Sequence, residues 1–135
     1  VARLNGRRLN ITADFRQRDL FTDIGGRYEM IVSNPPYIPT GVIPTLEEEV
    51  RSYDPNLALD GGEDGLSFYR RIVEQASTRL EDGGWLLFEI GHDQGRCVRD
   101  MMENAGYGEL QVVKDLAGRD RVVLGRRMYR RNRDV

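Results

Sequence analysis

The stretch Met30-Ile31-Val32-Ser33-Asn34-Pro35-Pro36-Tyr37 joins an apolar run to two consecutive prolines. The apolar run is typical of a buried strand in a parallel sheet. The prolines end it, because proline has a fixed φ and no N–H to donate, and because the residue before a proline is kept out of the helical region. Ligands of open α/β sheets bind at the carboxyl ends of the strands, so the stretch predicts a rigid binding turn at that edge.

The four residues after the strand, Asn34, Pro35, Pro36 and Tyr37, suit a planar NH2 group. The Asn34 side-chain oxygen and the Pro35 carbonyl are two acceptors that can hold both N–H groups of an amide or an exocyclic amine, and aim its nitrogen at an electrophile. The Tyr37 ring can stack on that group or face a sulfonium ion. The alternative is a plain proline turn after a strand.

Outward from this turn, the sequence alternates between strand and helix patterns. Apolar residues recur at helical spacing from Leu66 to Leu80, with Asp64 or Ser67 as the N-cap. Residues 81–84 are typical of a helix stop and turn. The Pro- and Gly-rich loop 38–64 is too long for a plain connector, which predicts a lid or binding loop. A second helix is expected at 94–104, and strands at 13–18, 28–33, 85–90, 110–114 and 121–124, the last two as an antiparallel pair.

Composition limits the function classes. The 135 residues make one domain or part of one, and a net charge of −2 argues against a large, uniformly basic nucleic-acid surface. Cys97 is the only cysteine, which excludes an internal disulfide, and His92 is the only histidine, which excludes a His-rich metal site. The sequence has no secretory signal and no long apolar span, so we expect no membrane contact and a cytoplasmic location.

Four blocks of the sequence resemble the peptide chain release factor N5-glutamine methyltransferases. The blocks are IVSNPPYIP (31–39), ALDGGEDGLSFYRRIVEQA (58–76), GGWLLFEIGHDQG (83–95) and KDLAGRDRVVLGR (114–126). The resemblance implies an α/β, Rossmann-like class I enzyme that uses S-adenosylmethionine and no metal. It extends to about Arg127, so we expect 1–127 to be the C-terminal part of a catalytic domain and 128–135 to be a basic tail.

By this resemblance, residues 34–37 grip the glutamine amide of the Gly-Gly-Gln loop in a release factor, the expected partner. Asn34, Pro35 and Tyr37 are the expected catalytic residues, and Pro36 completes the substrate site. Asn34 also lies beside the methionine part of S-adenosylmethionine in this family. Asp19 and Leu20 are the expected adenine contacts, whereas from sequence alone Asp19 is an ordinary turn residue.

Two features of the family's cofactor site are not found in this sequence. The family's glycine-rich loop after strand 1, and its acid after strand 2, have no counterpart in these 135 residues. We therefore expect a partial sheet in the order 4-5-7-6, with an antiparallel last pair and without the first two strands. The strand at 28–33 would then expose an apolar edge. We also expect the chain alone to be an inactive fragment.

Several smaller features have open roles. The stretch 60–65 is either a glycine turn or a substrate loop, and Asp54 stands where many relatives carry Glu. We expect His92 to cap the following helix or to contact the sheet edge, and not to act as a general base. A basic tail is expected to be a solvated end and not an RNA contact; its arginines are Arg126, Arg127, Arg130, Arg131 and Arg133.

Three functions fit these observations. The favoured one is methyl transfer to the glutamine of a release factor. The second is methyl transfer to an amino group of nucleic acid, such as adenine N6, with a flipped base stacked on Tyr37. The third is a module that binds release factors without catalysis.

Overall fold

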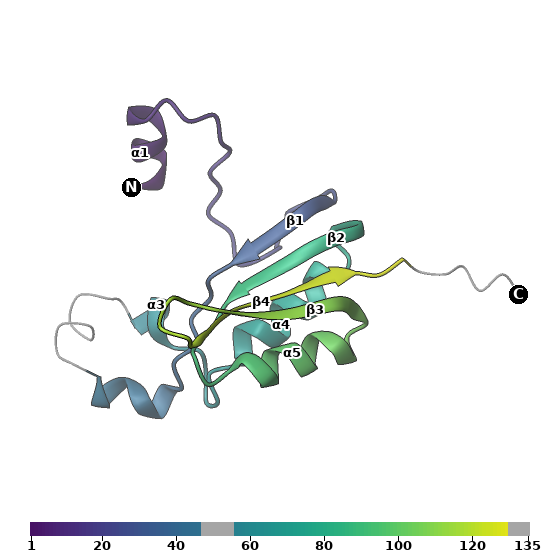
Figure 1. Ribbon diagram of the computed structural model, residues 1–135. Helices are drawn as coiled ribbons and strands as arrows, with labels where there is room; N and C mark the ends of the chain where they lie inside the picture. The colour runs from purple at the N-terminus through teal and green to yellow at the C-terminus, as the bar shows by residue number, and fades with distance from the viewer. Residues whose placement is uncertain (47–55, 130–135) are drawn as a thin grey trace, which may run out of the picture.

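The computed structural model describes residues 1–46 and 56–129, which form a four-stranded sheet and flanking helices (Figure 1). The elements are α1 (Ala2–Arg8), β1 (Tyr28–Ser33), η1 (Thr40–Thr45), α3 (Asn56–Leu59), α4 (Ser67–Ala76), β2 (Leu80–Glu89), α5 (Gly95–Asn104), β3 (Tyr107–Lys114) and β4 (Asp120–Arg127). The predicted long loop thus contains two short helices, and its middle part, including Asp54, lies outside the described residues.

The strand order is β1-β2-β4-β3. β1 runs parallel to β2, whereas β4 runs antiparallel to both β2 and β3. This is the predicted order 4-5-7-6 with an antiparallel last pair, and that prediction is confirmed. The parallel pair requires a crossover, which α4 supplies, and the two carboxyl ends of β1 and β2 therefore lie at the same edge.

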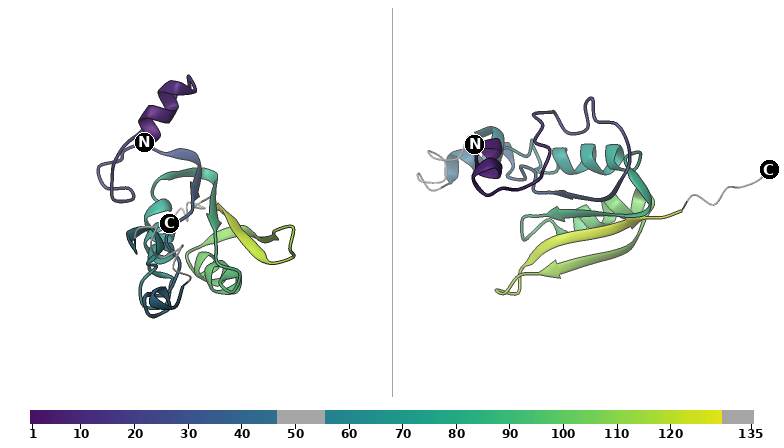
Figure 2. Two further views of the ribbon diagram at one scale, coloured as in Figure 1. Left: turned by 90° about the vertical axis from the view of Figure 1, so that its left-hand side faces the viewer. Right: turned by 90° about the horizontal axis from the view of Figure 1, so that it is seen from above.

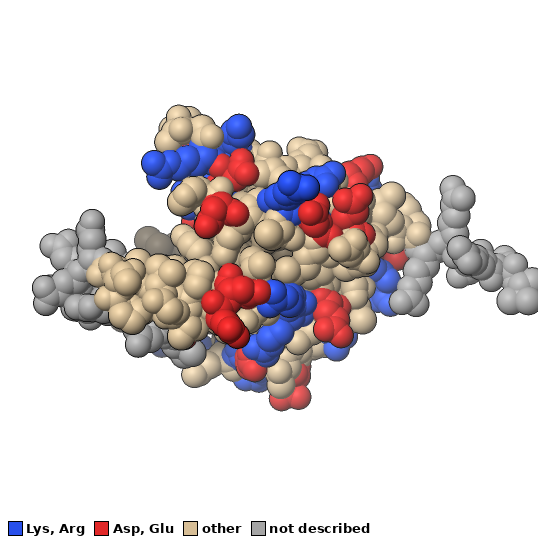
Figure 3. All heavy atoms as spheres, turned by 90° about the horizontal axis from the view of Figure 1, so that it is seen from below, with Lys and Arg blue, Asp and Glu red and all other residues tan. Residues whose placement is uncertain are grey.

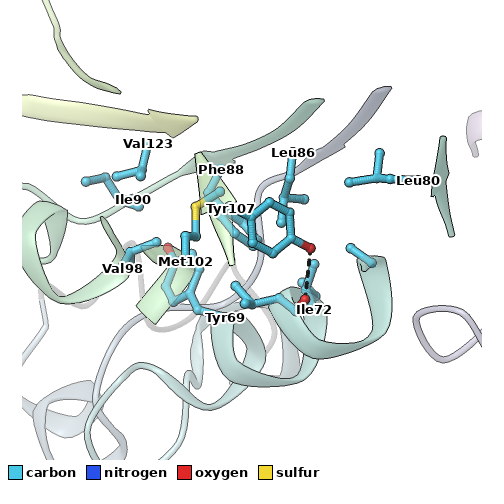
Figure 4. Close-up of a cluster of buried hydrophobic side chains, with 12 residues drawn as sticks. Tyr69, Ile72, Leu80, Leu86, Phe88, Ile90, Val98, Met102, Tyr107 and Val123 are labelled. Carbon is cyan, nitrogen blue, oxygen red and sulfur yellow. Dashed lines mark hydrogen bonds between the residues drawn. The ribbon is translucent and has the colours of Figure 1, made fainter. Parts of the chain in front are cut away.

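The helices α4 and α5 lie on one side of the sheet and cover its inward face (Figure 1). Side chains alternate along each strand, so every second residue of β2 points at these helices. Figure 4 shows the resulting core, in which the ring of Tyr69 meets Phe88 edge to face at 5.1 Å between centroids. Each large apolar side chain buried there stabilises the fold by about 1.5–3 kcal/mol. The fully buried side chains are Tyr69, Leu80, Leu86, Phe88, Ile90, Val98, Met102 and Val123.

The opposite face of the sheet and the outer edge of β1 are open among the described residues. Met30 and Val32 point to that face and are 54% and 69% exposed. α1 stands away from the sheet (Figure 2). The predicted exposure of an apolar strand edge is therefore confirmed for this part of the chain. The prediction that the apolar run is a buried strand is wrong, because β1 has no partner strand on its outer side and none of its residues is buried.

The predicted strand at 13–18 is wrong, because this segment pairs with no strand. It lies against α1 instead. Arg3 donates a hydrogen bond of 3.0 Å from Nη2 to the Phe15 carbonyl, and the Phe15 ring packs on Gly6, where a Cβ would come within 2.7 Å of it. Contact with a preceding helix takes the place of strand pairing, which the local sequence pattern does not reveal.

The first predicted helix is present as α4, with two corrections. Neither Asp64 nor Ser67 caps it: Leu66 is the N-cap and no side chain caps the helix. Asp64 instead accepts a 2.9 Å hydrogen bond from the Leu66 N–H and pairs with Arg70. The helix ends at Ala76, and Leu80, which fits the helical spacing, is already the first residue of β2.

Residues 81–84 do not form the predicted helix stop, because they belong to β2. Leu80 is paired with Tyr28 and Trp85 with Met30, so four residues of β2 lie opposite Glu29 alone in a large bulge. Gly83, with φ of +77°, turns the bulge, and its carbonyl accepts a 2.8 Å hydrogen bond from Arg126 Nε.

Arg126 and Arg127 are not part of a solvated tail, because both lie in β4. The Arg126 guanidinium lies over the Trp85 ring at 5.6 Å. Arg127 donates hydrogen bonds to the Leu80 carbonyl and to Asp82. The other three arginines, at 130, 131 and 133, lie outside the described residues.

Candidate functional site

The Asn-Pro-Pro-Tyr turn (residues 34–37) leaves β1 at the edge where β1 and β2 both end. Asn34 is exposed, whereas Pro35 is buried beneath it. A hollow of about 190 Å³ lies along the turn, and it is lined by Asn34, Pro35, Pro36, Tyr37, Ile38, Ala58, Leu59 and Glu89. The structure thus brings together all four residues that the sequence predicted for the substrate site, at the predicted edge of the sheet.

The turn is held from one side by the segment that follows α3. The Ile38 N–H donates to the Leu59 carbonyl at 3.1 Å, and the Gly61 N–H donates to the Ile38 carbonyl at 2.8 Å. Thr40 adds a hydrogen bond from its hydroxyl to Asp60 at 2.6 Å. This bond, with a second from the Gly62 N–H, holds the pKa of the Asp60 carboxyl below its usual value. These bonds brace the backbone just after the turn.

The acidic glycine loop (residues 60–65) packs directly on Tyr37. A Cβ at Gly61 would lie 2.7 Å from the Tyr37 Cα, and a Cβ at Gly65 would collide with the Tyr37 carbonyl oxygen. Gly65 also has φ of +76°, a conformation that L side chains rarely adopt. Of the two sequence interpretations, the described geometry favours a supporting turn, since the glycines allow two backbones to touch.

We expect Gly65→Ala to lower the free energy of unfolding by about 2–4 kcal/mol, from the strained φ together with the collision at Tyr37. Gly118→Ala is the matched control, because Gly118 has φ of +78° but nothing within 4 Å of its would-be Cβ. The control should lose only about 1 kcal/mol, the cost of the backbone strain alone. Urea unfolding of the unsubstituted chain and of the two variants measures both losses of unfolding free energy. Equal losses in the two variants would show that Gly65 is not tightly packed against Tyr37.

Gln94 also touches the turn, and the sequence did not single it out as a site residue. Its side chain is only 8% exposed and lies just before α5. The amide nitrogen donates to the Tyr37 carbonyl at 2.9 Å and to the Gly65 carbonyl at 3.3 Å, while its oxygen accepts from the Gly91 N–H at 3.0 Å. A single glutamine before a helix carries no sequence signal of such contacts.

Tyr69, which lies on α4, holds the end of β2 in place. Its hydroxyl donates a 2.8 Å hydrogen bond to the Glu89 carbonyl. Burial raises the pKa of the Tyr69 hydroxyl well above its usual value, so it stays a neutral donor. Tyr107 behaves alike: burial raises its pKa to about 12, and its hydroxyl donates to the Val73 carbonyl at 2.9 Å (Figure 4).

The two residues predicted to contact adenine lie before β1. Leu20, with φ of +50°, packs against the core, and it lines a hollow of about 590 Å³. The hollow follows β1 from Tyr28 to Ser33, and its lining mixes apolar residues with Asp14 and Arg16. This hollow adjoins the Asn-Pro-Pro-Tyr turn, because Ser33 is the residue before Asn34. Asp19 is outside the hollow's lining, and its carboxylate forms an exposed ion pair with Arg71 at 3.1 Å.

These residues fit S-adenosylmethionine in part. The apolar side chains beside Leu20, such as Phe21 and Ile31, suit a flat adenine ring, and Asn34 offers a polar group just past the end of the same strand, β1. Asp19 pairs with Arg71, but its exposed carboxylate has further lone pairs that can accept from an amino group. The charged residues in the lining, Asp14 and Arg16, are paired with each other at 2.6 Å.

His92 is exposed in the turn before α5 and does not cap that helix, whose N-cap is Gln94. His92 and Cys97 line a third hollow of about 340 Å³ on the other side of Tyr37. In the described part of the chain, no three His, Cys, Asp or Glu residues are grouped to hold a metal ion.

The surface seen from below carries acidic and basic side chains side by side (Figure 3). Ion pairs along α4 and α5 account for part of this mixture, such as Arg99 with Glu103 at 3.2 Å. No continuous basic stripe of the kind that binds nucleic acid is visible on this face. None of the described helices is long and apolar enough to cross a membrane.

Comparison with known proteins finds close relatives but no matching family model. The release factor glutamine methyltransferase of Caulobacter vibrioides is 48% identical over 128 residues, which are 93% of this chain and 44% of that protein. The proteins of the same name from Geobacter sulfurreducens and Moorella thermoacetica are 44% and 45% identical, over 93% and 97% of this chain. The chain spans about half the length of these relatives.

Two solved structures that are similar to this chain are also methyltransferases. A protein-(glutamine-N5) methyltransferase (release factor-specific) from Alicyclobacillus acidocaldarius matches 81% of this chain and 54% of its own, at a TM-score of 0.51 and 30% identity. A methyltransferase from Pyrococcus furiosus matches 95% of this chain and 56% of its own, at a TM-score of 0.64. Its 17% identity supports the fold alone, a partial Rossmann-like methyltransferase sheet.

Proposed function

This chain is homologous to the release factor glutamine methyltransferases over about half of their length, and on that premise we propose that it forms part of an enzyme that methylates a release factor. The acceptor is the side-chain amide nitrogen of the glutamine in the Gly-Gly-Gln loop. The reaction takes place in the cytoplasm, where release factors work. The observation that carries the proposal is the exposed Asn34 on a braced turn at the carboxyl edge of the sheet.

Methyl transfer to a glutamine amide depends more on how the amide is oriented than on a strong acid or base in the site. An amide nitrogen is a poor nucleophile, because its lone pair is delocalised into the carbonyl. The Asn34 side-chain oxygen and the Pro35 carbonyl accept the two N–H groups, which fixes the amide plane and aims the nitrogen. The same acceptors favour the positive charge that develops on nitrogen during transfer. Pro36 and the Tyr37 ring complete the wall against which the planar group lies.

S-adenosylmethionine, when bound, supplies the methyl group from its sulfonium. Leu20 and the apolar side chains beside it would hold the adenine, Asp19 would accept from its amino group, and Asn34 would lie beside the methionine part. As the glutamine nitrogen would bond to the methyl carbon, the carbon–sulfur bond would break, the sulfur would leave as a neutral thioether, and the nitrogen would release one proton to water. The described residues therefore supply the acceptor site and one flank of the donor site.

We expect labelled methyl groups to go to a release factor and not to DNA. The test uses a chimera in which residues 1–135 replace the matching part of the Caulobacter relative, incubated with labelled S-adenosylmethionine and either a release factor or duplex DNA. A release factor with Ala in place of the Gly-Gly-Gln glutamine is the control and should stay unlabelled. Label in DNA with none in protein would move the assignment to an amino methyltransferase of nucleic acid. Binding of the release factor without labelling would indicate a non-catalytic module.

A further inference from the structure

We propose that Gln94 is a positioning residue for methyl transfer, because its buried amide clamps the Asn-Pro-Pro-Tyr turn in place. This inference rests on the proposed function for its kinetic part. Both N–H groups of the Gln94 amide and its oxygen are used, on three segments that are far apart in the sequence: Tyr37, Gly65 and Gly91. A buried side chain that makes hydrogen bonds to three segments holds those segments at one spacing.

The packing around the clamp leaves the turn little freedom. Gly61 and Gly65 touch the Tyr37 backbone, and a Cβ at Gly91 would lie 3.2 Å from the Tyr37 ring and 3.1 Å from the Gln94 oxygen. The backbone and the ring of Tyr37 are therefore confined by three glycines and one amide. Relaxation of this cluster moves the Tyr37 end of the turn, which the two prolines join to the acceptors.

The connection to the reaction follows from the geometry of the turn. Two prolines stand between Asn34 and Tyr37 and restrict the backbone between them, so a shift at the Tyr37 carbonyl is passed on to the Pro35 carbonyl and to Asn34. Misplacement of reacting groups by about 1 Å costs on the order of a hundredfold in rate. Gln94 itself touches neither the glutamine nor the methyl donor in this arrangement.

Two variants separate the clamp from ordinary stability. Gln94→Met keeps the size and removes all three hydrogen bonds, and Gln94→Glu keeps the acceptor but places a carboxylate against two carbonyls. Tyr107→Phe is the matched control, because it removes one buried hydrogen bond, of 2.9 Å to the Val73 carbonyl, without touching the turn.

In the 135-residue chain, hydrogen exchange in Gln94→Met should accelerate at least about tenfold at the Gly91, Ile38 and Gly61 amides, since these depend on the clamp. Amides of the central strand β4 should keep their protection. A uniform acceleration that includes β4, or no change at the three amides, would overturn the clamp. This result does not depend on any activity.

In the chimera, Gln94→Met should lower kcat about tenfold to a hundredfold while KM for S-adenosylmethionine stays within about threefold, and Gln94→Glu should lower kcat further. Tyr107→Phe should keep kcat within about threefold. An unchanged kcat in Gln94→Met, or an equal loss in Tyr107→Phe, would overturn the positioning role. If the unsubstituted chimera transfers no methyl group, the proposed function fails, while hydrogen exchange still decides whether Gln94 clamps the turn.

Discussion

Asn34→Ala is expected to cut methyl transfer to a release factor by about two to four orders of magnitude, the scale for losing a group that both orients the nucleophile and stabilises its charge. The physical reason lies in the acceptor pair. Without the Asn34 oxygen, one N–H of the glutamine amide returns to water, and the amide plane rotates about its single remaining bond. Because Asn34 is exposed at the strand end, the substitution leaves the core intact.

Single-turnover rates of the chimera measure this effect directly. Asn104→Ala is the matched control, since Asn104 is an exposed asparagine at the last position of α5, outside the candidate site. The control should react at the unsubstituted rate. An Asn34→Ala rate within threefold of the unsubstituted rate would remove Asn34 from the mechanism.

The second large effect concerns the methyl donor. We expect residues 1–135, tested by themselves, to bind S-adenosylmethionine no tighter than about 1 mM, which corresponds to about −4 kcal/mol. Among the described residues, the donor contacts that the family resemblance names are Leu20, Asp19 and Asn34, and the two charged residues that also line the hollow beside Leu20, Asp14 and Arg16, are paired with each other at 2.6 Å. Few contacts must then offset several kcal/mol of lost ligand freedom.

Calorimetric titration of the 135-residue chain and of the chimera tests this expectation. The chimera supplies the remaining flank of the site and should bind at least about a hundredfold tighter, because the added contacts offset more of the fixed cost of immobilising the same ligand. Micromolar binding at one site per 135-residue chain would contradict the assignment of a single flank to these residues. If neither the 135-residue chain nor the chimera bound S-adenosylmethionine, the assignment of S-adenosylmethionine as the methyl donor would be contradicted.

Local sequence patterns predicted the parts of the molecule in which neighbouring residues decide the outcome. The apolar run of β1 followed by two prolines can only be a strand that stops, and its stop had to lie at the ligand edge of a parallel sheet. The periodicity of α4 and α5 likewise follows from one apolar stripe that faces the sheet. The strand order was right because four blocks resembled one family, not because the spacing reveals pairing.

The predictions failed where distant partners compete with local preference. Residues 13–18 have a strand-like pattern but lie against α1, and the glycines at 83 and 84 belong to a bulge of β2 instead of ending a helix. Arg126 and Arg127 looked like the start of a tail, yet Trp85 and the bulge carbonyls hold them in β4. In each case the deciding contact is with a residue far along the chain.

The sequence by itself determined the strand that stops at Asn34, the chemistry that its acceptors suit and the family that carries this turn. Only the tertiary structure decided how the turn is held. Gln94, Gly65 and Gly91 are separated from Tyr37 by 28 or more positions in the sequence, and folding brings them within hydrogen-bond or contact distance of it. The physical reason is that acceptor chemistry belongs to single residues, whereas rigidity requires partners from several segments, and those meet only in the folded chain.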